Sequence, residues 1–122
     1  MKLVFPMPPN LTNRVSGHSH WSVRGREKKA YLALCDQCQL IGRLPKPPKH
    51  PIQEASVSSV MYLGSAMDDD NALARHKWAL DWLKTRGFIV DDRRKCIRWS
   101  GLPEQVIKRD GNYRIEITLE AA

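Results

Sequence analysis

The chain has 122 residues, of which 42% are hydrophobic and 27% are charged. This length suits one folded domain and is too short for two independent cores, and the composition excludes a disordered or fibrous protein. We therefore expect a single domain over residues 1–122. Twenty Lys and Arg residues against thirteen Asp and Glu residues give a formal charge of +7, which fits either a polyanionic partner or ordinary solubility charge.

Neither membrane insertion nor secretion is expected, and the cysteines do not form a disulfide framework. No apolar run approaches the roughly 20 residues that cross a bilayer, and residues 1–10 lack the apolar segment of a secretory signal. Three cysteines are an odd number, and Cys35 and Cys38 have C-x-x-C spacing without a second ligand pair. Reduced thiols are therefore favoured over zinc, and a cytoplasmic protein is expected.

The first half of the chain predicts a strand, a helix and a loop. Residues 2–7 read as a short strand that prolines end, because proline cannot donate to a sheet. Residues 10–29 read as an exposed basic segment leading into a helix over 30–41, with Gly42 as its stop. Four prolines and three cations in residues 43–51 predict an irregular basic loop over about 43–53.

The second half predicts a strand, the longest helix of the chain and then further strands. Residues 54–64 read as a half-buried strand, and residues 71–86 as a helix that Gly87 closes. Three further strand signals follow, at residues 88–90, 96–99 and 113–119. This order predicts an α+β domain in which a mixed sheet packs with helices.

Three consecutive aspartates precede the helix predicted over residues 71–86, and they have two interpretations. They can cap the free N–H groups and complement the helix dipole. Alternatively, Asp68 and Asp70 point to the same side of an extended segment and repel each other unless a cation lies between them. Hard carboxylate oxygens are the ligands that Mg²⁺ prefers.

A lysine and a second acidic pair extend this pattern. Lys77 follows Asp70 by seven residues, which places both on one helix face, with the lysine leaning back toward the aspartates. A lysine with a solvated head is the alternative. Asp91 and Asp92 end the returning strand and point opposite ways, so that one of them can approach the helix entry. Carboxylates with a lysine suit phosphodiester hydrolysis, and no phosphate-binding loop or nucleophile motif competes.

Several motifs of the chain occur in the order found in one known family. They are Phe5-Pro-Met-Pro-Pro-Asn-Leu-Thr-Asn-Arg14, Asp68-Asp69-Asp70-Asn71, Lys77, Gly87-Phe88 and Asp91-Asp92. With these motifs the chain resembles the RusA family of Holliday junction resolvases, which is common in phages and prophages. The pieces cover most of the chain, and the central 25 residues are the most specific.

The resemblance implies a small homodimeric α+β endonuclease that nicks two opposing strands of a four-way DNA junction with Mg²⁺, for which Mn²⁺ can substitute. It implies that Asp68, Asp70 and Asp92 bind the metal and that Lys77 is the catalytic lysine. Asn71 would support the loop, and Arg75 is the alternative to the lysine. Asp69 departs from the family pattern, which has an uncharged residue there.

The expected partners are branched DNA and a second copy of the chain, in the cytoplasm of a bacterial or phage-infected cell, without a nucleotide cofactor. Two symmetric incisions require two sites, hence a dimer. Trp78 and Trp82 read as packing or dimer-contact residues rather than a base-stacking platform. Two alternatives remain: a nuclease for flaps, forks or other branched DNA, and a catalytically silent DNA-binding protein. The cations expected to contact phosphates are Arg14, Arg24, Arg26, Lys28, Lys29, Lys46, Lys49, Arg93 and Arg94.

Overall fold

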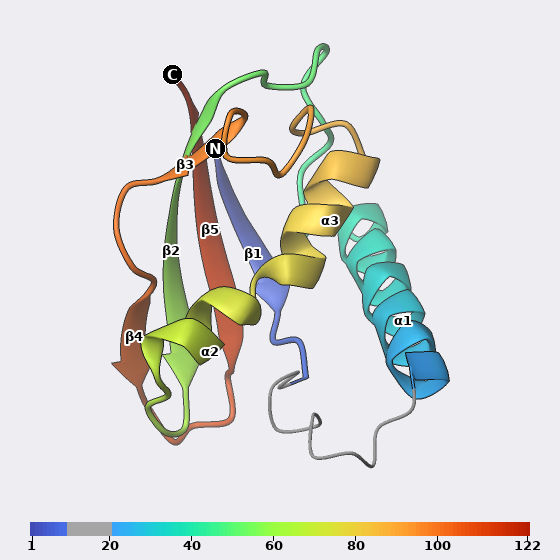
Figure 1. The fold of residues 1–122 in the computed structure, drawn as a ribbon. Helices are drawn as coiled ribbons and strands as arrows, with labels where there is room; N and C mark the ends of the chain where they lie inside the picture. Colours follow the sequence, from blue (N-terminus) through green and yellow to red (C-terminus); the bar gives the residue numbers. More distant parts are fainter. Residues whose placement is uncertain (10–20) are drawn as a thin grey trace.

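The computed structural model describes residues 1–9 and 21–122, and the side chains of the first helix from residue 25 onward. It shows the expected α+β domain, in which helices pack on a mixed sheet (Figure 1). No helix in the described part of the chain is long and apolar enough to cross a membrane. The elements are β1 (Lys2–Pro6), α1 (Trp21–Leu40), β2 (Ala55–Leu63), α2 (Asp69–Ala74), α3 (Lys77–Thr85), β3 (Ile97–Trp99), β4 (Glu104–Ile107) and β5 (Arg114–Ala121).

The sheet is built around β2, which pairs with three other strands. β5 lies antiparallel between β1 and β2. On the other side of β2, β3 runs parallel to residues 55–57 and β4 runs parallel to residues 60–63. Because parallel strands need a crossover connection, the chain leaves β2 through α2 and α3 before it returns as β3.

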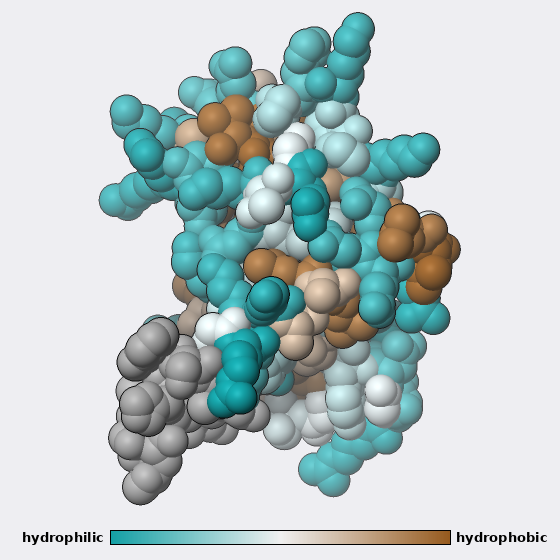
Figure 2. Space-filling view, turned by 90° about the vertical axis from the view of Figure 1, so that its right-hand side faces the viewer, coloured by the Kyte–Doolittle hydropathy of each residue, from teal (hydrophilic) through white to brown (hydrophobic). Residues whose placement is uncertain are grey.

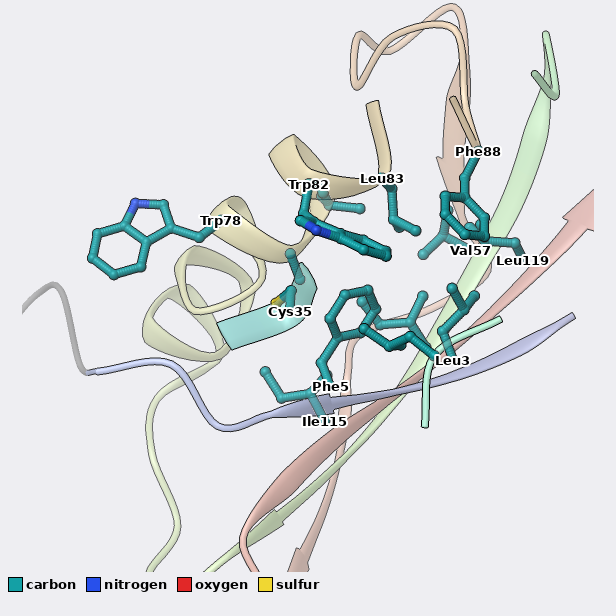
Figure 3. Packing of buried hydrophobic residues seen from close by; sticks show 14 of the residues in the cluster. Leu3, Phe5, Cys35, Val57, Trp78, Trp82, Leu83, Phe88, Ile115 and Leu119 are labelled. Atoms are coloured by element: carbon teal, nitrogen blue, oxygen red, sulfur yellow. The ribbon is translucent and has the colours of Figure 1, made fainter. Parts of the chain in front are cut away.

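Alternating apolar residues face the helices and form the core. In β5, Ile115, Ile117 and Leu119 are buried, as the alternation predicts. The Phe5 ring meets Trp82 of α3 edge-on, with the ring centroids 5.7 Å apart (Figure 3). Trp78 also belongs to the buried cluster, at a distance from the Phe5 and Trp82 rings in Figure 3, and its ring centroid is 6.0 Å from that of Tyr31 on α1. The two tryptophans are buried, which confirms that they pack within the chain.

The first helix is longer than predicted. α1 begins at Trp21 rather than residue 30, so part of the exposed basic segment that was expected to lead into the helix is itself helical. Lys and Arg are good helix formers, and polar composition alone does not prevent a helix. The helix ends at Leu40, and Gly42 with φ 83° follows it, as predicted. Residues 43–53 form no helix or strand beyond one bridge at Ile52, in agreement with the expected loop.

The single helix predicted over residues 71–86 is wrong, because the structure has α2 and α3 with a break at Arg75 and His76. His76 is fully buried, and it makes hydrogen bonds to Ser59 of β2 and to the Ala72 carbonyl. A polar residue buried at this point fixes the turn between the two helices. Helical periodicity did not reveal the break, because His76 has no helix-breaking character in the sequence.

Two strand predictions also need correction. Residues 88–90 form no strand, and only an isolated bridge joins Ile89 to Ile52. β4 was not predicted, because the short run Glu104–Ile107 does not alternate clearly and pairs only with one end of β2. The remaining strands lie close to the predicted positions.

Candidate functional site

The Lys77 side chain is held between two carboxylates. As the first residue of α3, it places its Nζ 2.7 Å from Asp92 Oδ2 and 3.2 Å from Asp81 Oδ1. Asp92 comes from the segment after α3, while Asp81 lies one turn further along α3. The structure thus brings together two of the four residues that the motif pattern singled out, although they are 15 positions apart.

The contacts of Lys77 shift the pKa values of the site so that both the lysine and its carboxylate partner stay charged. The hydrogen bond to Asp92 raises the pKa of Lys77 above its ordinary value, and burial opposes this only in part. The same bond lowers the pKa of Asp92. The Lys77 side chain keeps 58% of its surface exposed, so its positive charge remains within reach of a ligand.

Asp81 is a residue of this site that the sequence interpretation missed. Its carboxylate lies between Lys77 of its own helix and Lys28 of α1, whose Nζ is 2.8 Å from Oδ2. Burial alone would raise the pKa of Asp81, but the hydrogen bonds from Lys28 and Lys77 lower it. The spacing of four from Lys77 was a signal for one ion pair. The bridge to α1 depends on tertiary packing.

Asp91 and Asp92 have different partners, although residues 88–90 do not form the strand from which their opposite directions were expected. Asp91 Oδ2 lies 2.6 Å from Arg93 Nε, and Oδ1 lies 3.4 Å from Lys84 Nζ. Asp91 Oδ1 also accepts the backbone N–H of Asp92 at 2.8 Å. Asp91 therefore orders the turn, which leaves Asp92 as the member of the pair that reaches Lys77.

The three consecutive aspartates at the start of α2 are exposed. Asp68 is the N-cap residue of α2, but its side chain makes no capping hydrogen bond. Asp69 and Asp70 lie in the first turn, where their charge complements the helix dipole. Within residues 1–9 and 25–122, no side chain forms an ion pair with these three carboxylates. The capping interpretation therefore fails for Asp68, while the dipole effect remains for the other two.

A polar hollow of about 550 Å³ adjoins Asp68. Asn71, Arg75 and Tyr113 line it together with the turn after β2. Arg75 donates from Nε to the Pro8 carbonyl at 2.9 Å, so it ties α2 to the segment after β1. Arg75 was the alternative to Lys77 as the catalytic cation. Its guanidinium group binds a backbone carbonyl rather than the carboxylates that hold Lys77, which favours Lys77 for this role.

The chemistry of the free carboxylates suits a hard cation, but no metal cluster is preassembled among the residues that the structure describes. No group of three His, Cys, Asp or Glu side chains in this part of the chain lies close enough together to hold an ion. Asp92 uses Oδ2 for its bond to Lys77. No ion pair with another described side chain engages its Oδ1, which therefore remains available as a ligand.

The cysteines of the C-x-x-C pair face the interior. Cys35 and Cys38 are buried on α1 and are free thiols. Burial raises the pKa of Cys35 to about 12, so its thiol stays protonated and unreactive. These findings confirm the expectation of reduced thiols.

The predicted phosphate-contacting cations fall into three groups. Arg14 and the Arg24 side chain lie outside the described residues. Lys28 and Arg93 pair with the acidic groups of the site. The others form no ion pair with a described residue, and they are Arg26, Lys29, Lys46, Lys49 and Arg94. The molecular face on the α1 side is largely hydrophilic, with separate small hydrophobic patches (Figure 2).

No protein family matches this chain, and no curated protein matches it either.

Proposed function

We propose that the protein is a Mg²⁺-dependent, structure-selective DNA endonuclease of the RusA type, which resolves four-way junctions by paired symmetric nicks. The observation that carries this proposal is the 2.7 Å contact between Lys77 and Asp92. If the aspartates served only to cap the helix, no lysine held by a carboxylate would be needed. If Lys77 were an ordinary solvated surface lysine, its ammonium group would not be held by two carboxylates. The free aspartates Asp68 and Asp70 in the same short stretch of chain supply the remaining acidic groups.

Each group has a defined role in this proposal. Asp68, Asp70 and Asp92 would hold Mg²⁺, with Mn²⁺ as a substitute; when bound, the ion supplies Lewis-acid chemistry at a phosphate and a more acidic water. Lys77 stays protonated, because Asp92 and Asp81 raise its pKa, and it offers positive charge to a phosphate that gains negative charge. Asp81 and Lys28 fix the position of Lys77 by joining α3 to α1.

A homodimer is part of the same proposal. The described part of the chain offers one such site, and two symmetric incisions across a two-fold junction need two sites. The exposed cations would hold the junction arms through phosphates, so that the DNA is recognised by shape rather than by base sequence.

The decisive experiment compares wild type with Asp70→Asn and Asp69→Asn on a synthetic four-way junction with Mg²⁺. Both variants remove one exposed negative charge from the same helix turn. Only Asp70 belongs to the proposed ligand set, so we expect paired nicking to fall at least 100-fold in Asp70→Asn and to stay near wild type in Asp69→Asn. Junction binding in Ca²⁺, measured by gel shift, should persist in both variants.

Other outcomes separate the alternatives. Faster cleavage of flaps or forks than of four-way junctions would keep the chemistry and change the substrate. If the wild type binds DNA but does not cleave it in either Mg²⁺ or Mn²⁺, the nuclease proposal is rejected and the protein is a catalytically silent DNA-binding protein.

A further inference from the structure

Trp99 of β3 is the aromatic residue whose surroundings the proposed chemistry leaves unexplained. It pairs in register with Val57, so its side chain is on the helix-covered side of the sheet at the β3 edge. The Trp99 and His76 rings pack in a T-shaped arrangement with their centroids 5.2 Å apart. Trp99 remains partly exposed, in contrast to Trp78 and Trp82.

Two surface hollows meet at Trp99. The first, of about 560 Å³, is almost wholly apolar, and it is lined by Leu73, Ala74, Lys77, Leu80 and Trp99. The second, of about 540 Å³, is lined by Arg94, Ile97, Arg98 and Trp99. The indole therefore lines both hollows, an apolar one to which Lys77 also contributes and one to which Arg94 and Arg98 contribute.

The charges around Trp99 identify the occupant. Arg94 and Arg98 are exposed and form no ion pair with the side chains that the structure describes. An apolar hollow with an aromatic side chain in its wall suits a flat apolar group, and the unpaired cations beside it suit anionic groups on either side of that flat group. An unpaired nucleotide has this form, since its base stacks on an aromatic ring and its two phosphates meet cations.

We propose that Trp99 is a stacking platform for one unpaired base of single-stranded DNA. The base enters the apolar hollow beside Leu73 and Leu80, and Arg94 and Arg98 bind the phosphate on the other side of the indole. Lys77 faces the phosphate on the near side. The inference deepens the proposed function, because it places a splayed base of branched DNA next to the lysine of the proposed active site.

The test measures binding in EDTA, so that no cleavage occurs. The probes are a fluorescein-labelled twelve-nucleotide oligo(dT) and a labelled, fully paired hairpin duplex of equal charge. Fluorescence anisotropy measures the binding of each probe. We expect Trp99→Leu to weaken oligo(dT) binding by roughly tenfold or more and duplex binding by less than twofold, because Leu keeps much of the apolar volume and removes the stacking surface. Trp99→Phe should restore most of the oligo(dT) affinity.

Charge variants keep the test decisive if Trp99→Leu does not fold. Arg94→Gln with Arg98→Gln should weaken oligo(dT) binding and reduce its salt dependence by about 0.7 in the log–log slope for each phosphate that is no longer neutralised. Lys108→Gln with Arg109→Gln is the matched control, because these exposed cations follow β4 at the other end of β2. The control pair should leave oligo(dT) binding unchanged.

The outcomes for this inference and for the proposed function are distinct. Unchanged oligo(dT) binding in folded Trp99→Leu would overturn the inference, and so would an equal loss of affinity for oligo(dT) and duplex. If the Arg94 and Arg98 pair behaves like its control, the inference also fails. Junction cleavage that persists in these cases leaves the nuclease proposal intact. Trp99-dependent oligo(dT) binding without any cleavage supports the platform and rejects the nuclease.

Discussion

The tautomer of neutral His76 is fixed by its two neighbours. Its Nδ1 lies 2.7 Å from the Ala72 carbonyl oxygen, and its Nε2 lies 2.5 Å from the Ser59 hydroxyl. Because a carbonyl only accepts, Nδ1 carries a proton, and in the neutral ring Nε2 therefore accepts the hydrogen bond from Ser59. The ring is fully buried and neutral, and burial lowers its pKa below the ordinary 6.5. This residue holds the turn that places Lys77 at the start of α3.

The buried neutral His76 should make the protein acid-sensitive. In the unfolded chain His76 binds a proton near pH 6.5, whereas in the fold it resists protonation. Stability is therefore fully present above this pH, and the free energy of unfolding decreases below it, by up to about 1.4 kcal/mol per pH unit until the folded pKa is reached. Urea unfolding between pH 5 and pH 8 measures this.

His76→Gln is the comparison for that series. It should be less stable at pH 8 and should lack the added slope between pH 5 and pH 6.5. An identical slope in wild type and variant would show that His76 does not set the acid sensitivity.

At the scale of elements, Asp36 joins α1 to α3. Its Oδ1 accepts from the indole N–H of Trp82 at 2.9 Å and from Arg86 Nε at 2.8 Å, and Oδ2 accepts from Arg86 Nη2 at 2.6 Å. The hydrogen bonds from Arg86 and Trp82 lower the pKa of Asp36. Lys28 and Asp81 form a second link between the same helices. These links orient α3, and α3 in turn carries Lys77.

Removal of the Asp36 carboxylate should cost more than its exposed ion pair suggests. Asp36→Ala leaves the indole N–H of the buried Trp82 without its acceptor, so we expect the free energy of unfolding to fall by about 1–3 kcal/mol. Asp36→Asn keeps an oxygen for this N–H and should cost about half as much. Thermal and urea unfolding of both variants measure the difference. Equal destabilisation would show that the charge, rather than the indole hydrogen bond, matters.

At the scale of the whole molecule, the excess of positive charge lies outside the acidic site. The described acidic groups Asp81, Asp91 and Asp92 are each paired with cations. The loop over residues 43–53 carries Lys46 and Lys49, which form no ion pair with described residues. Such cations bind DNA through phosphates, and this binding releases counterions.

The loop cations should therefore appear in the salt dependence of DNA binding. We expect Lys46→Gln with Lys49→Gln to weaken duplex and junction binding alike and to reduce the log–log salt slope by about 0.9 for each phosphate that the loop neutralises in wild type. Anisotropy titrations between about 50 and 200 mM KCl, over which affinity that depends on phosphate contacts falls steeply, measure the slope. A slope equal to that of wild type would place the loop outside the DNA interface.

Features that depend on local pattern could be predicted from the amino-acid sequence. Alternation in residues 113–119 predicted the burial of Ile115, Ile117 and Leu119, although Tyr113 of the same pattern is exposed. The glycines at positions 42 and 87 predicted helix ends, and both adopt positive φ. Composition and element order predicted the α+β class. The motif order singled out Lys77 and Asp92 before any contact between them was known.

Features that depend on distant neighbours required the packed fold. The break between α2 and α3 arises from the burial of His76 against Ser59 of β2, and neither residue alone signals it. Asp81 became part of the site only when α1 brought Lys28 to it, and Trp99 gained its two hollows only when β3 met α2 and α3. Periodicity reports which face of an element is buried, whereas packing between elements decides which polar groups meet.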